Sequence, residues 1–425
     1  MNRHIPALFI IGVTAITAGI AAAAEAGASP GWPQFLGPYR DGISRETVPL
    51  AASWPQGGPP VLWSFALEDG FGGAAVLGDE VFVADREASM SNVLYCLDLA
   101  TGAKKWRVAF EAKGKQPSHP GTRCTPAVDE KRVYFIDPYA TVYCIDRATH
   151  ALAWSTNLVT AFACEIPKWE CGQSPLLFKD MLILAPSGKK GGIVALKKAT
   201  GEVAWKSQDI GGQTHSSPMA VKVGNSVQIV TIALGGISGV DAADGTLLWR
   251  WPWNGVKPIP NPAYCGGGRF FLVEGYGSGC AMICVTNDAS GAFTVTNIFS
   301  NTLCHGQIPT PIYHGGYIYT SGNSNKQNDG FMCLDQTGAV KWKTGRKPWF
   351  ERGNFLMAGG MIYHLDGASG VLRLIKPDPD AYTQLAEAPV TKGGQAWAPL
   401  AITSGKLLVR GKNDLTCLDV RAKQK

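Results

Sequence analysis

The stretch from Cys96 to Trp106 reads CLDLATGAKKW: a small residue, an Asp two positions later, a Thr-Gly turn, and a tryptophan four residues after the glycine. Variants of this stretch recur from Cys144 to Trp154 (CIDRATHALAW), Ala195 to Trp205 (ALKKATGEVAW), Gly239 to Trp249 (GVDAADGTLLW) and Cys333 to Trp342 (CLDQTGAVKW). Successive tryptophans are 48, 51, 44 and 93 residues apart, and the last interval equals two periods. A repeat of roughly 42–50 residues is typical of β-propeller blades, each a four-stranded sheet that cannot bury its faces alone.

Prolines mark the same period a second time. Each precedes an apolar run that is expected to form the innermost strand of a unit: Pro126, Pro175, Pro218, Pro311 and Pro399. Short runs rich in β-branched and aromatic residues follow within each unit, such as residues 80–84 and 132–136, and turn residues bound them.

The period divides the chain into eight units, and five of them carry the tryptophan. The unit at residues 266–299 has Val295 where the tryptophan is expected, and the unit at 356–388 is degenerate. The last unit, 399–420, has only three strands, so residues 61–67 with Trp63 are expected to supply its outer strand. We therefore predict an all-β, eight-bladed β-propeller over residues 61–423, with its ring closed by an N-terminal strand that removes free sheet edges.

The repeated tryptophans are predicted to be structural. Each indole can bury a large apolar face against the adjoining blade while its N–H finds an acceptor. The glycine permits the tight turn before the outer strand, and the small residue two before the Asp leaves room for the ring. The set comprises Trp63, Trp106, Trp154, Trp205, Trp249 and Trp342.

Residues 1–26 are expected to be a signal peptide. Arg3 and His4 precede an apolar stretch over residues 5–23, and small residues follow it. A single membrane anchor is the alternative, because the stretch nearly reaches spanning length. Residues 27–60 then form an N-terminal arm. We expect a periplasmic or secreted monomer with no membrane span after removal of the signal.

The net charge gives no sign of a nucleic-acid partner. The formal charge is +6, but Lys and Arg are scattered along the chain without forming a run. No nucleic-acid-binding module is visible either, so we expect no nucleic acid among the partners.

The signature resembles the tryptophan-docking motif of pyrroloquinoline-quinone-type (PQQ-like) propeller repeats. The stretch Trp32 to Gly42 (WPQFLGPYRDG) is similar to the leader of many secreted bacterial proteins with these repeats. The resemblance covers the chain from Trp32 to about Val420. It implies the fold but leaves the activity open, because this superfamily holds quinoprotein dehydrogenases as well as non-catalytic proteins such as the BamB-type outer-membrane assembly lipoprotein.

The repeat also sorts the eleven cysteines. One group occupies one register before the Asp position and is expected to be buried free thiols: Cys96, Cys144, Cys284, Cys333 and Cys417. The other six are expected to gather at one mouth of the channel: Cys124, Cys164, Cys171, Cys265, Cys280 and Cys304. An even number in an exported protein favours disulfides, first Cys164–Cys171 and Cys265 with Cys280 or Cys304, and unpaired buried thiols are the alternative. No metal-binding spacing occurs, so no metal ligand is predicted.

Candidate binding residues lie in the loops that lead into the innermost strands. These loops converge on one mouth of the channel, where imidazole, carboxylate and guanidinium groups can bind a small anion, a sugar or a peptide end. The alternative is that they bond the loop backbone. The candidates are His119, Arg123, Glu170, Gln173, His215, His305, Gln307, Arg352, Asn354 and Trp397. Polar ends of second strands add Asp85, Asp137, Glu274 and Asp366, and tryptophans outside the register, such as Trp169, either anchor a partner or pack within loops.

Two functions follow from these patterns. The first is a non-catalytic propeller that binds a protein or cell-envelope component on its loop face, without a cofactor or catalytic residue. The absence of a triad, a nucleotide loop or a carboxylate pair at recognisable spacing favours it. The second, implied by the resemblance, is an alcohol-oxidising quinoprotein oxidoreductase that uses PQQ and calcium. The chain departs from those enzymes, since it lacks an adjacent Cys-Cys pair, their large inserted loops, a matching calcium-ligand set and a haem motif.

Overall fold

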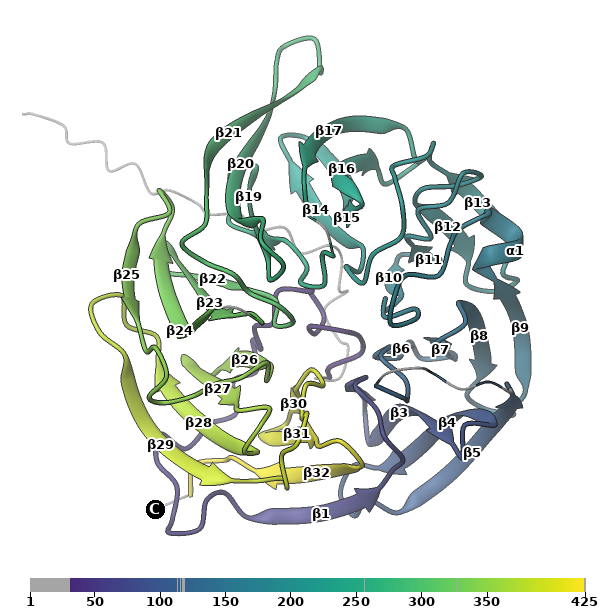
Figure 1. Ribbon diagram of the computed structural model, residues 1–425. Coiled ribbons are helices and arrows are strands. Elements are labelled where there is room, and N and C mark those ends of the chain that lie inside the picture. The colour runs from purple at the N-terminus through teal and green to yellow at the C-terminus, as the bar shows by residue number, and fades with distance from the viewer. Residues whose placement is uncertain are drawn as a thin grey trace, which may run out of the picture.

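The computed structural model describes residues 31–423 with the exception of 113, 115, 117, 118, 256 and 326. Within this part of the chain, eight four-stranded antiparallel sheets surround a central channel (Figure 1). The predicted eight-bladed all-β propeller is confirmed. The predicted signal peptide, residues 1–26, lies outside the described residues.

We number the blades 1 to 8 from β2 onward, and their strands run from the channel to the rim. The innermost strands are β2 (Ala74–Leu77), β6 (Ala127–Val128), β10 (Leu176–Phe178), β14 (Met219–Val223), β18 (Ala263–Tyr264), β22 (Ile312–His314), β26 (Phe355–Ala358) and β30 (Ala401–Thr403). The second strands are β3 (Glu80–Glu87), β7 (Arg132–Ile136), β11 (Met181–Leu184), β15 (Ser226–Ala233), β19 (Arg269–Glu274), β23 (Tyr317–Asn323), β27 (Met361–Leu365) and β31 (Lys406–Arg410). The third strands are β4 (Ser91–Asp98), β8 (Thr141–Asp146), β12 (Val194–Lys197), β16 (Gly235–Asp241), β20 (Gly279–Asn287), β24 (Asn328–Asp335), β28 (Val371–Lys376) and β32 (Asp414–Asp419). The outer strands are β5 (Lys104–Glu111), β9 (Leu152–Asn157), β13 (Val203–Lys206), β17 (Leu247–Trp253), β21 (Phe293–Asn301), β25 (Val340–Lys343), β29 (Thr383–Pro389) and, in blade 8, β1 (Val61–Ala66).

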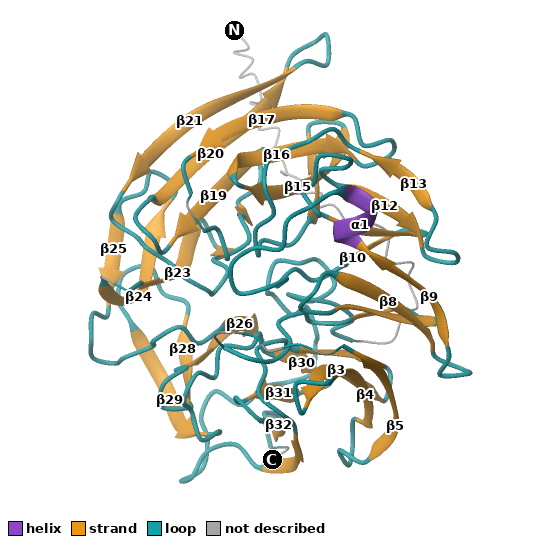
Figure 2. Cartoon of the chain, turned by 45° about the vertical axis from the view of Figure 1, so that its right-hand side comes forward, coloured by secondary structure: helices purple, strands orange, loops and turns teal. Residues whose placement is uncertain are grey.

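Burial explains the sequence of the strands. The second strand β3 is covered on both faces by neighbouring blades, so nearly all of its residues are buried. The outer strand β5 alternates between exposed and half-buried residues, as expected of a strand with one solvated face. One short helix, α1 (Leu158–Phe162), occurs in the described part of the chain; Asn157 caps its N-terminus beside blades 2 and 3 (Figure 2).

The ring closes where the sequence predicts. Strand β1 pairs with β32, and Trp63 lies opposite Cys417. The Trp63 indole donates a hydrogen bond from Nε1 to the carbonyl of Leu99 in blade 1 at 3.0 Å. The first and last parts of the chain therefore share blade 8, and the closing strand is confirmed.

The tryptophans dock on the turn of the next blade. A Cβ atom placed on Gly102 would lie 2.6 Å from the ring of Trp63, and one on Gly201 would lie 2.7 Å from the ring of Trp154. Where blade 2 replaces the glycine with His150, its imidazole stacks on Trp106 with ring centroids 4.7 Å apart. The glycines are thus needed for the close approach of a ring as well as for their positive φ.

The expected small residue stands directly across from each ring, followed by a β-bulge. The pairs are Cys96 with Trp106, Cys144 with Trp154, Ala195 with Trp205, Gly239 with Trp249 and Cys333 with Trp342. Most indole N–H groups find acceptors, such as the carbonyl of Lys198 for Trp154 and that of Asp378 for Trp342. Trp205 differs from these, since its buried Nε1 has no partner among the described residues.

Blade 5 corrects the sequence register. Its β20–β21 hairpin is longer than the others and projects beyond the ring (Figure 1). Phe299, not Val295, takes the docking position: it faces Met282 at the bulge, and a Cβ on Gly338 of blade 6 would lie 2.8 Å from its ring. Cys284 therefore lies two residues beyond the position that faces the docked ring, and it is only half-buried.

The N-terminal arm crosses the channel. Trp32 forms a bridge with Val76 of blade 1, and Ile43 forms a parallel bridge with Met357 of blade 7. The leader-like stretch Trp32 to Gly42 lies between these two points, so it spans the ring from inside (Figure 1).

Arg40 anchors this arm. Its side chain is 2% exposed, and its guanidinium donates hydrogen bonds to the carbonyls of Ser174, Pro175 and Pro218, which precede the innermost strands of blades 3 and 4. Burial lowers the pKa of Arg40 to about 9, so the group stays charged at neutral pH. A buried guanidinium with several carbonyl acceptors ties the arm to two blades.

A matched pair of glycine substitutions tests ring docking. Gly102 and Gly291 both have positive φ (+72° and +85°), but a Cβ on Gly291 would meet nothing within 4 Å. We expect Gly291→Ala to lower the free energy of unfolding by about 1 kcal/mol through backbone strain. Gly102→Ala should cost about 1–3 kcal/mol more, because the new methyl group collides with Trp63. Equal losses in urea unfolding would show that the ring does not rest on the glycine.

A second pair tests the arm. Arg40→Met removes the buried donor and leaves its three carbonyl acceptors without it, so we expect a loss of at least about 2 kcal/mol in the free energy of unfolding. Arg45→Ala removes an ion pair to Asp41 that is half exposed, and it should cost less than about 1 kcal/mol. Thermal and urea unfolding of both variants provide the measurement, and similar small effects would contradict the anchoring role.

Candidate functional site

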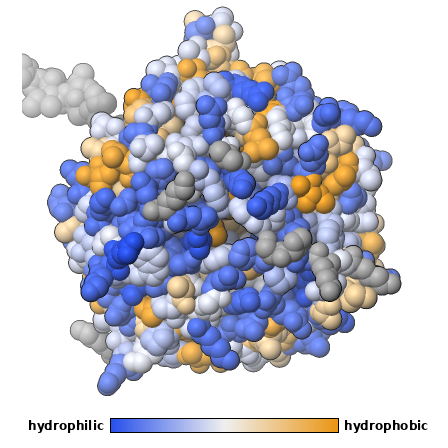
Figure 3. Space-filling view, in the orientation of Figure 1, coloured by the Kyte–Doolittle hydropathy of each residue, from blue (hydrophilic) through white to orange (hydrophobic). Residues whose placement is uncertain are grey.

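A cavity of about 560 Å³ opens in the middle of the loop face. Figure 3 looks onto this face and shows a hollow near its centre. Phe35 of the arm lines the cavity together with loops of many blades, so the arm forms its floor. The lining comprises Phe35, Phe71, His119, Arg123, Trp169, Gly172, Ser174, His215, Ser217, Ile259, Tyr276, Gln307, Ile308, Asn325, Glu351, Arg352, Asn354, Ala368, Gly394, Gln395, Trp397 and Pro399.

The positive charge of Arg123 is paired with the carboxylate of Glu170. Its Nη2 lies 3.1 Å from Oε2 of Glu170 and donates to the carbonyl of His119 at 2.8 Å. The guanidinium also lies over the ring of Phe71, 5.6 Å from its centroid. Burial lowers the pKa of Arg123, whereas the carboxylate of Glu170 opposes that shift.

Arg352 organises the opposite part of the wall. It forms an ion pair with Glu351, donates from Nε to Oε1 of Gln307 at 2.6 Å, and lies 5.4 Å from the ring centroid of Trp397. Trp397 in turn donates from Nε1 to Oε2 of Glu351 at 2.5 Å. Asn354 donates to the carbonyl of Trp397, so every polar group of this cluster holds another in place.

Aromatic rings gather in two places. Trp397 stacks on Phe71, with centroids 5.4 Å apart and planes at 26°. Trp169 stacks on Tyr276 at 5.8 Å and 29°, and Nζ of Lys257 lies 4.9 Å from the centroid of Trp169. The two stacked pairs come from loops in different sectors of the ring, namely blades 7 to 1 and blades 2 to 5.

His215 contributes an uncharged imidazole. Its ring centroid is 6.3 Å from that of Trp169. Burial, reinforced by the charge of Arg123, lowers the pKa of His215 to about 4. The side chain is therefore a neutral hydrogen-bonding group at physiological pH.

The structure brings seven of the ten predicted site residues to the cavity: His119, Arg123, His215, Gln307, Arg352, Asn354 and Trp397. The other three support the loops. Glu170 lies behind Arg123, Gln173 is buried and donates to the carbonyls of Ala185 and Thr214, and a ring nitrogen of His305 contacts the carbonyl of Thr302.

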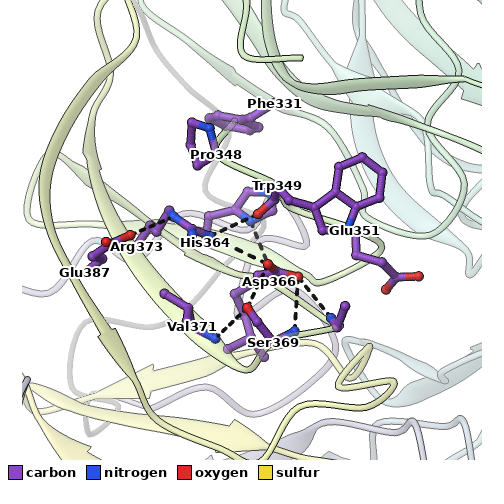
Figure 4. A network of polar contacts seen from close by, with 12 residues as sticks. Phe331, Pro348, Trp349, Glu351, His364, Asp366, Ser369, Val371, Arg373 and Glu387 are labelled. Atoms are coloured by element: carbon purple, nitrogen blue, oxygen red, sulfur yellow. Dashed lines mark hydrogen bonds and ion pairs between the residues drawn. The ribbon is translucent and has the colours of Figure 1, made fainter. Parts of the chain in front are cut away.

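The polar ends of second strands stabilise turns rather than line the cavity. Asp366 accepts from the backbone of Ala368 and the hydroxyl of Ser369, and lies 3.8 Å from Arg373 (Figure 4). The Glu351 carboxylate points away from this network. Asp85 pairs with buried Arg410 at 3.1 Å, Asp137 accepts from the backbone of Tyr139 and Thr141, and Glu274 accepts from that of Tyr276 and Ser278.

Several lining residues have no signal in the sequence repeat. Phe71, Tyr276 and Asn325 occur once each in loops of different blades, and only the ring brings them together. Phe35 was visible as part of the leader-like stretch, but nothing in the sequence placed that stretch in the channel. Glu351 adjoins the predicted Arg352, and this adjacency was the one available clue.

The disulfide prediction is wrong, because all eleven cysteines are free thiols. The six loop cysteines do not gather at the mouth. Cys124, Cys164 and Cys171 lie in one core cluster, and Cys265, Cys280 and Cys304 lie in another. Contact with the Cys280 thiol, together with burial, raises the pKa of Cys304 well above its usual value. These side chains fill apolar space between blades, as free cysteines do.

Comparison with known proteins identifies the family. A sequence profile of the family described as outer membrane protein assembly factor BamB matches residues 56–137, 95–344 and 233–421, which together run through all eight blades. The chain belongs to this family. The resemblance to PQQ-like propellers seen in the sequence is thereby confirmed. None of the curated protein sequences matches this BamB-family chain at a significant level.

Solved structures resemble the chain in fold. BamB from Moraxella catarrhalis has a TM-score of 0.60 at 16% identity, over 86% of this chain and 99% of its own. Quinohemoprotein alcohol dehydrogenase from Comamonas testosteroni has a TM-score of 0.63 at 14% identity, and the match covers 95% of this chain and 82% of the enzyme. The computationally designed Ika8 protein has a TM-score of 0.57 at 11% identity, and the match covers 85% of this chain and 100% of the designed protein. At these identities the likeness shows the fold alone.

The cavity of this BamB-family propeller does not fit the calcium-bound quinone of the alcohol-oxidising enzymes. Calcium requires six to eight oxygen ligands with several carboxylates. Glu351 is the one carboxylate in the described lining, and its two oxygens already accept from Arg352 and Trp397. The described residues contain no cluster of three His, Cys, Asp or Glu side chains that could hold a metal.

Among the residues that the structure describes, no helix is long and apolar enough to cross a membrane.

The pKa of His215 predicts a pH effect. Because the fold lowers the pKa of His215 from 6.5 to about 4, the folded state favours the neutral ring. The neutral His215 ring therefore stabilises the folded state fully above pH 6.5, and this stabilisation is lost as the pH falls towards 4. We expect the free energy of unfolding to fall less steeply over this range in His215→Gln than in the wild type. His364 has its pKa lowered to about 3 and acts in the same direction, so the difference between the two proteins is the measure. NMR titration of the His215 ring with a pKa near 6.5 would contradict the expectation.

Proposed function

We propose that this BamB-family propeller is a non-catalytic binding protein of the cell envelope. The signal peptide at residues 1–26 exports it, and it acts as a monomer in the periplasm or outside the cell. The 27–60 arm and the 61–423 propeller work as one binding unit, and the loop-face cavity receives a protein or another envelope component.

The observation that carries this proposal is the internal pairing of the charged groups in the cavity. Arg123 is paired with Glu170, and Arg352 with Glu351. A general base must reach the substrate with a pKa near the working pH. Glu351 is occupied by donors, and His215 is a weak base with a pKa of about 4. The wall is therefore arranged to hold a ligand in a fixed geometry.

The family supports the same conclusion. The family description names an outer membrane assembly factor, and the match to BamB from Moraxella catarrhalis covers 99% of the BamB chain. A protein or envelope partner is the function class that such a relationship suggests. The quinoprotein alternative has no calcium-ligand set in the described residues to favour it.

Site-directed photo-cross-linking tests the proposal. A photoreactive amino acid at Asn325, which is exposed at the cavity, is compared with one at Asn225, which is exposed in the β14–β15 turn on the opposite face. In cell-envelope extract from the organism of origin, we expect discrete adducts from position 325 and none from position 225. Melting curves confirm that both variants fold.

Two results would contradict the proposal. Equal labelling from both positions would show that the cavity face has no special role. A rise of several degrees in melting temperature with PQQ and Ca²⁺ would show that a cofactor binds the native state.

A further inference from the structure

We propose that the cavity binds a neutral carbohydrate, at the scale of one or two sugar rings. This inference rests on the proposed binding function and names the chemistry of its ligand. Four features of the cavity carry it: its aromatic rings, its paired arginines, its hydrogen-bonding side chains and the arm across its floor.

The aromatic faces are arranged to hold a flat, C–H-rich ligand. Trp397 with Phe71 forms one stacked pair, beside the guanidinium of Arg352, and Trp169 with Tyr276 forms the other, beside the ammonium group of Lys257. Both tryptophans are half-buried and line the cavity. The face of an aromatic ring is negative, so it attracts the partly positive C–H groups on the face of a sugar ring.

The charges favour a neutral ligand. Each cavity arginine already has a carboxylate within 3.1 Å, and His215 is neutral. A carboxylate or phosphate ligand would have to displace Glu170 or Glu351 from its arginine, which would leave a partly buried charge unpaired. Two lysines lie beside Trp169, outside the arginine pairs: the Nζ atoms of Lys257 and Lys168 are 4.9 and 5.4 Å from its ring centroid.

The remaining polar groups suit hydroxyls. Gln307, Asn325 and Asn354 present planar amides at the wall, and each uses part of its hydrogen-bonding capacity within the wall. Ser174 and Ser217 also lie among the lining residues, and each hydroxyl accepts one backbone N–H. An amide offers both donors and acceptors, and a carboxylate such as that of Glu351 has lone pairs beyond those used here. Neighbouring sugar hydroxyls both donate and accept, so they can join this wall without disrupting the arginine pairs.

The arm disfavours an extended peptide. One common way to bind an extended peptide is to add it as a strand to a free sheet edge. In this channel the arm itself bridges β2 through Trp32 and Val76, and β26 through Ile43 and Met357. The volume of about 560 Å³ is within the usual range for a small-molecule site.

Isothermal titration with defined probes tests the proposal. The neutral probes are maltose, cellobiose and N,N′-diacetylchitobiose; the comparison probes are digalacturonic acid and trialanine. We expect at least one neutral disaccharide to bind with a Kd of about 0.01–1 mM. Digalacturonic acid and trialanine should bind at least tenfold more weakly.

Matched tryptophan variants locate the site. Trp397→Ala and Trp169→Ala should each raise the Kd at least tenfold. Trp251→Ala, which removes the same side chain from outer strand β17, should leave the Kd unchanged. Because Trp397→Ala also removes a hydrogen bond to Glu351, melting curves accompany it, and saturation-transfer NMR reports whether sugar C–H protons contact aromatic rings in the wild type.

The outcomes separate the two proposals. Absence of binding for all three neutral disaccharides, preference for the acid or the peptide, or equal loss in Trp251→Ala would overturn the carbohydrate inference. If cross-linking at Asn325 persists in that case, the proposed binding function stands with a different ligand. If both experiments fail, neither proposal holds.

Discussion

The propeller depends most on one recurring contact: at four junctions an aromatic ring from one blade lies on the turn glycine of the next, namely Trp63 on Gly102, Trp154 on Gly201, Trp205 on Gly245 and Phe299 on Gly338. The approach is so close that a methyl group on Gly102, Gly201 or Gly245 would overlap the docked ring. The contact buries a large apolar face that a single blade would expose. It also tolerates exchange, because Phe299 docks on Gly338, and His150 replaces a glycine by stacking on Trp106. These junctions share an aromatic ring packed against a turn, whereas blade 7 has Ala386 at the bulge position that a ring occupies in the other blades.

The arm has a comparable influence on the site. Repeated blades alone enclose an open channel, but the arm crosses it and places Phe35 at the floor of the cavity. The guanidinium of Arg40, which anchors the arm, donates to backbone carbonyls of two blades. The anchoring therefore does not depend on particular side chains in the wall. A channel that would otherwise run through the ring thus becomes a pocket with a defined depth.

The cavity wall illustrates how such a fold acquires a specific site. Each blade contributes a few loop residues, and the ring brings them within hydrogen-bonding distance although they are far apart in sequence. Gln307 links Tyr276 to Arg352, and Arg352 links Glu351 to Trp397. These bonds hold the groups before any ligand arrives, so little conformational freedom remains to be lost on binding.

The sequence by itself determined the repeat, the number of blades and the closing strand, because most blades supply a ring, a turn and a small facing residue from a local stretch of chain. It also named seven of the lining residues, since the loops before the innermost strands can be counted from the same period. It misplaced Cys284 and missed Phe299, because the longer β20–β21 hairpin shifts the register without leaving a mark in the motif. Only the tertiary structure decided that the cysteines stay unpaired, that the arm floors the channel, and that Phe71 and Tyr276 join the site. Those outcomes depend on which loops meet across the ring, and contacts between distant segments carry no periodic signal.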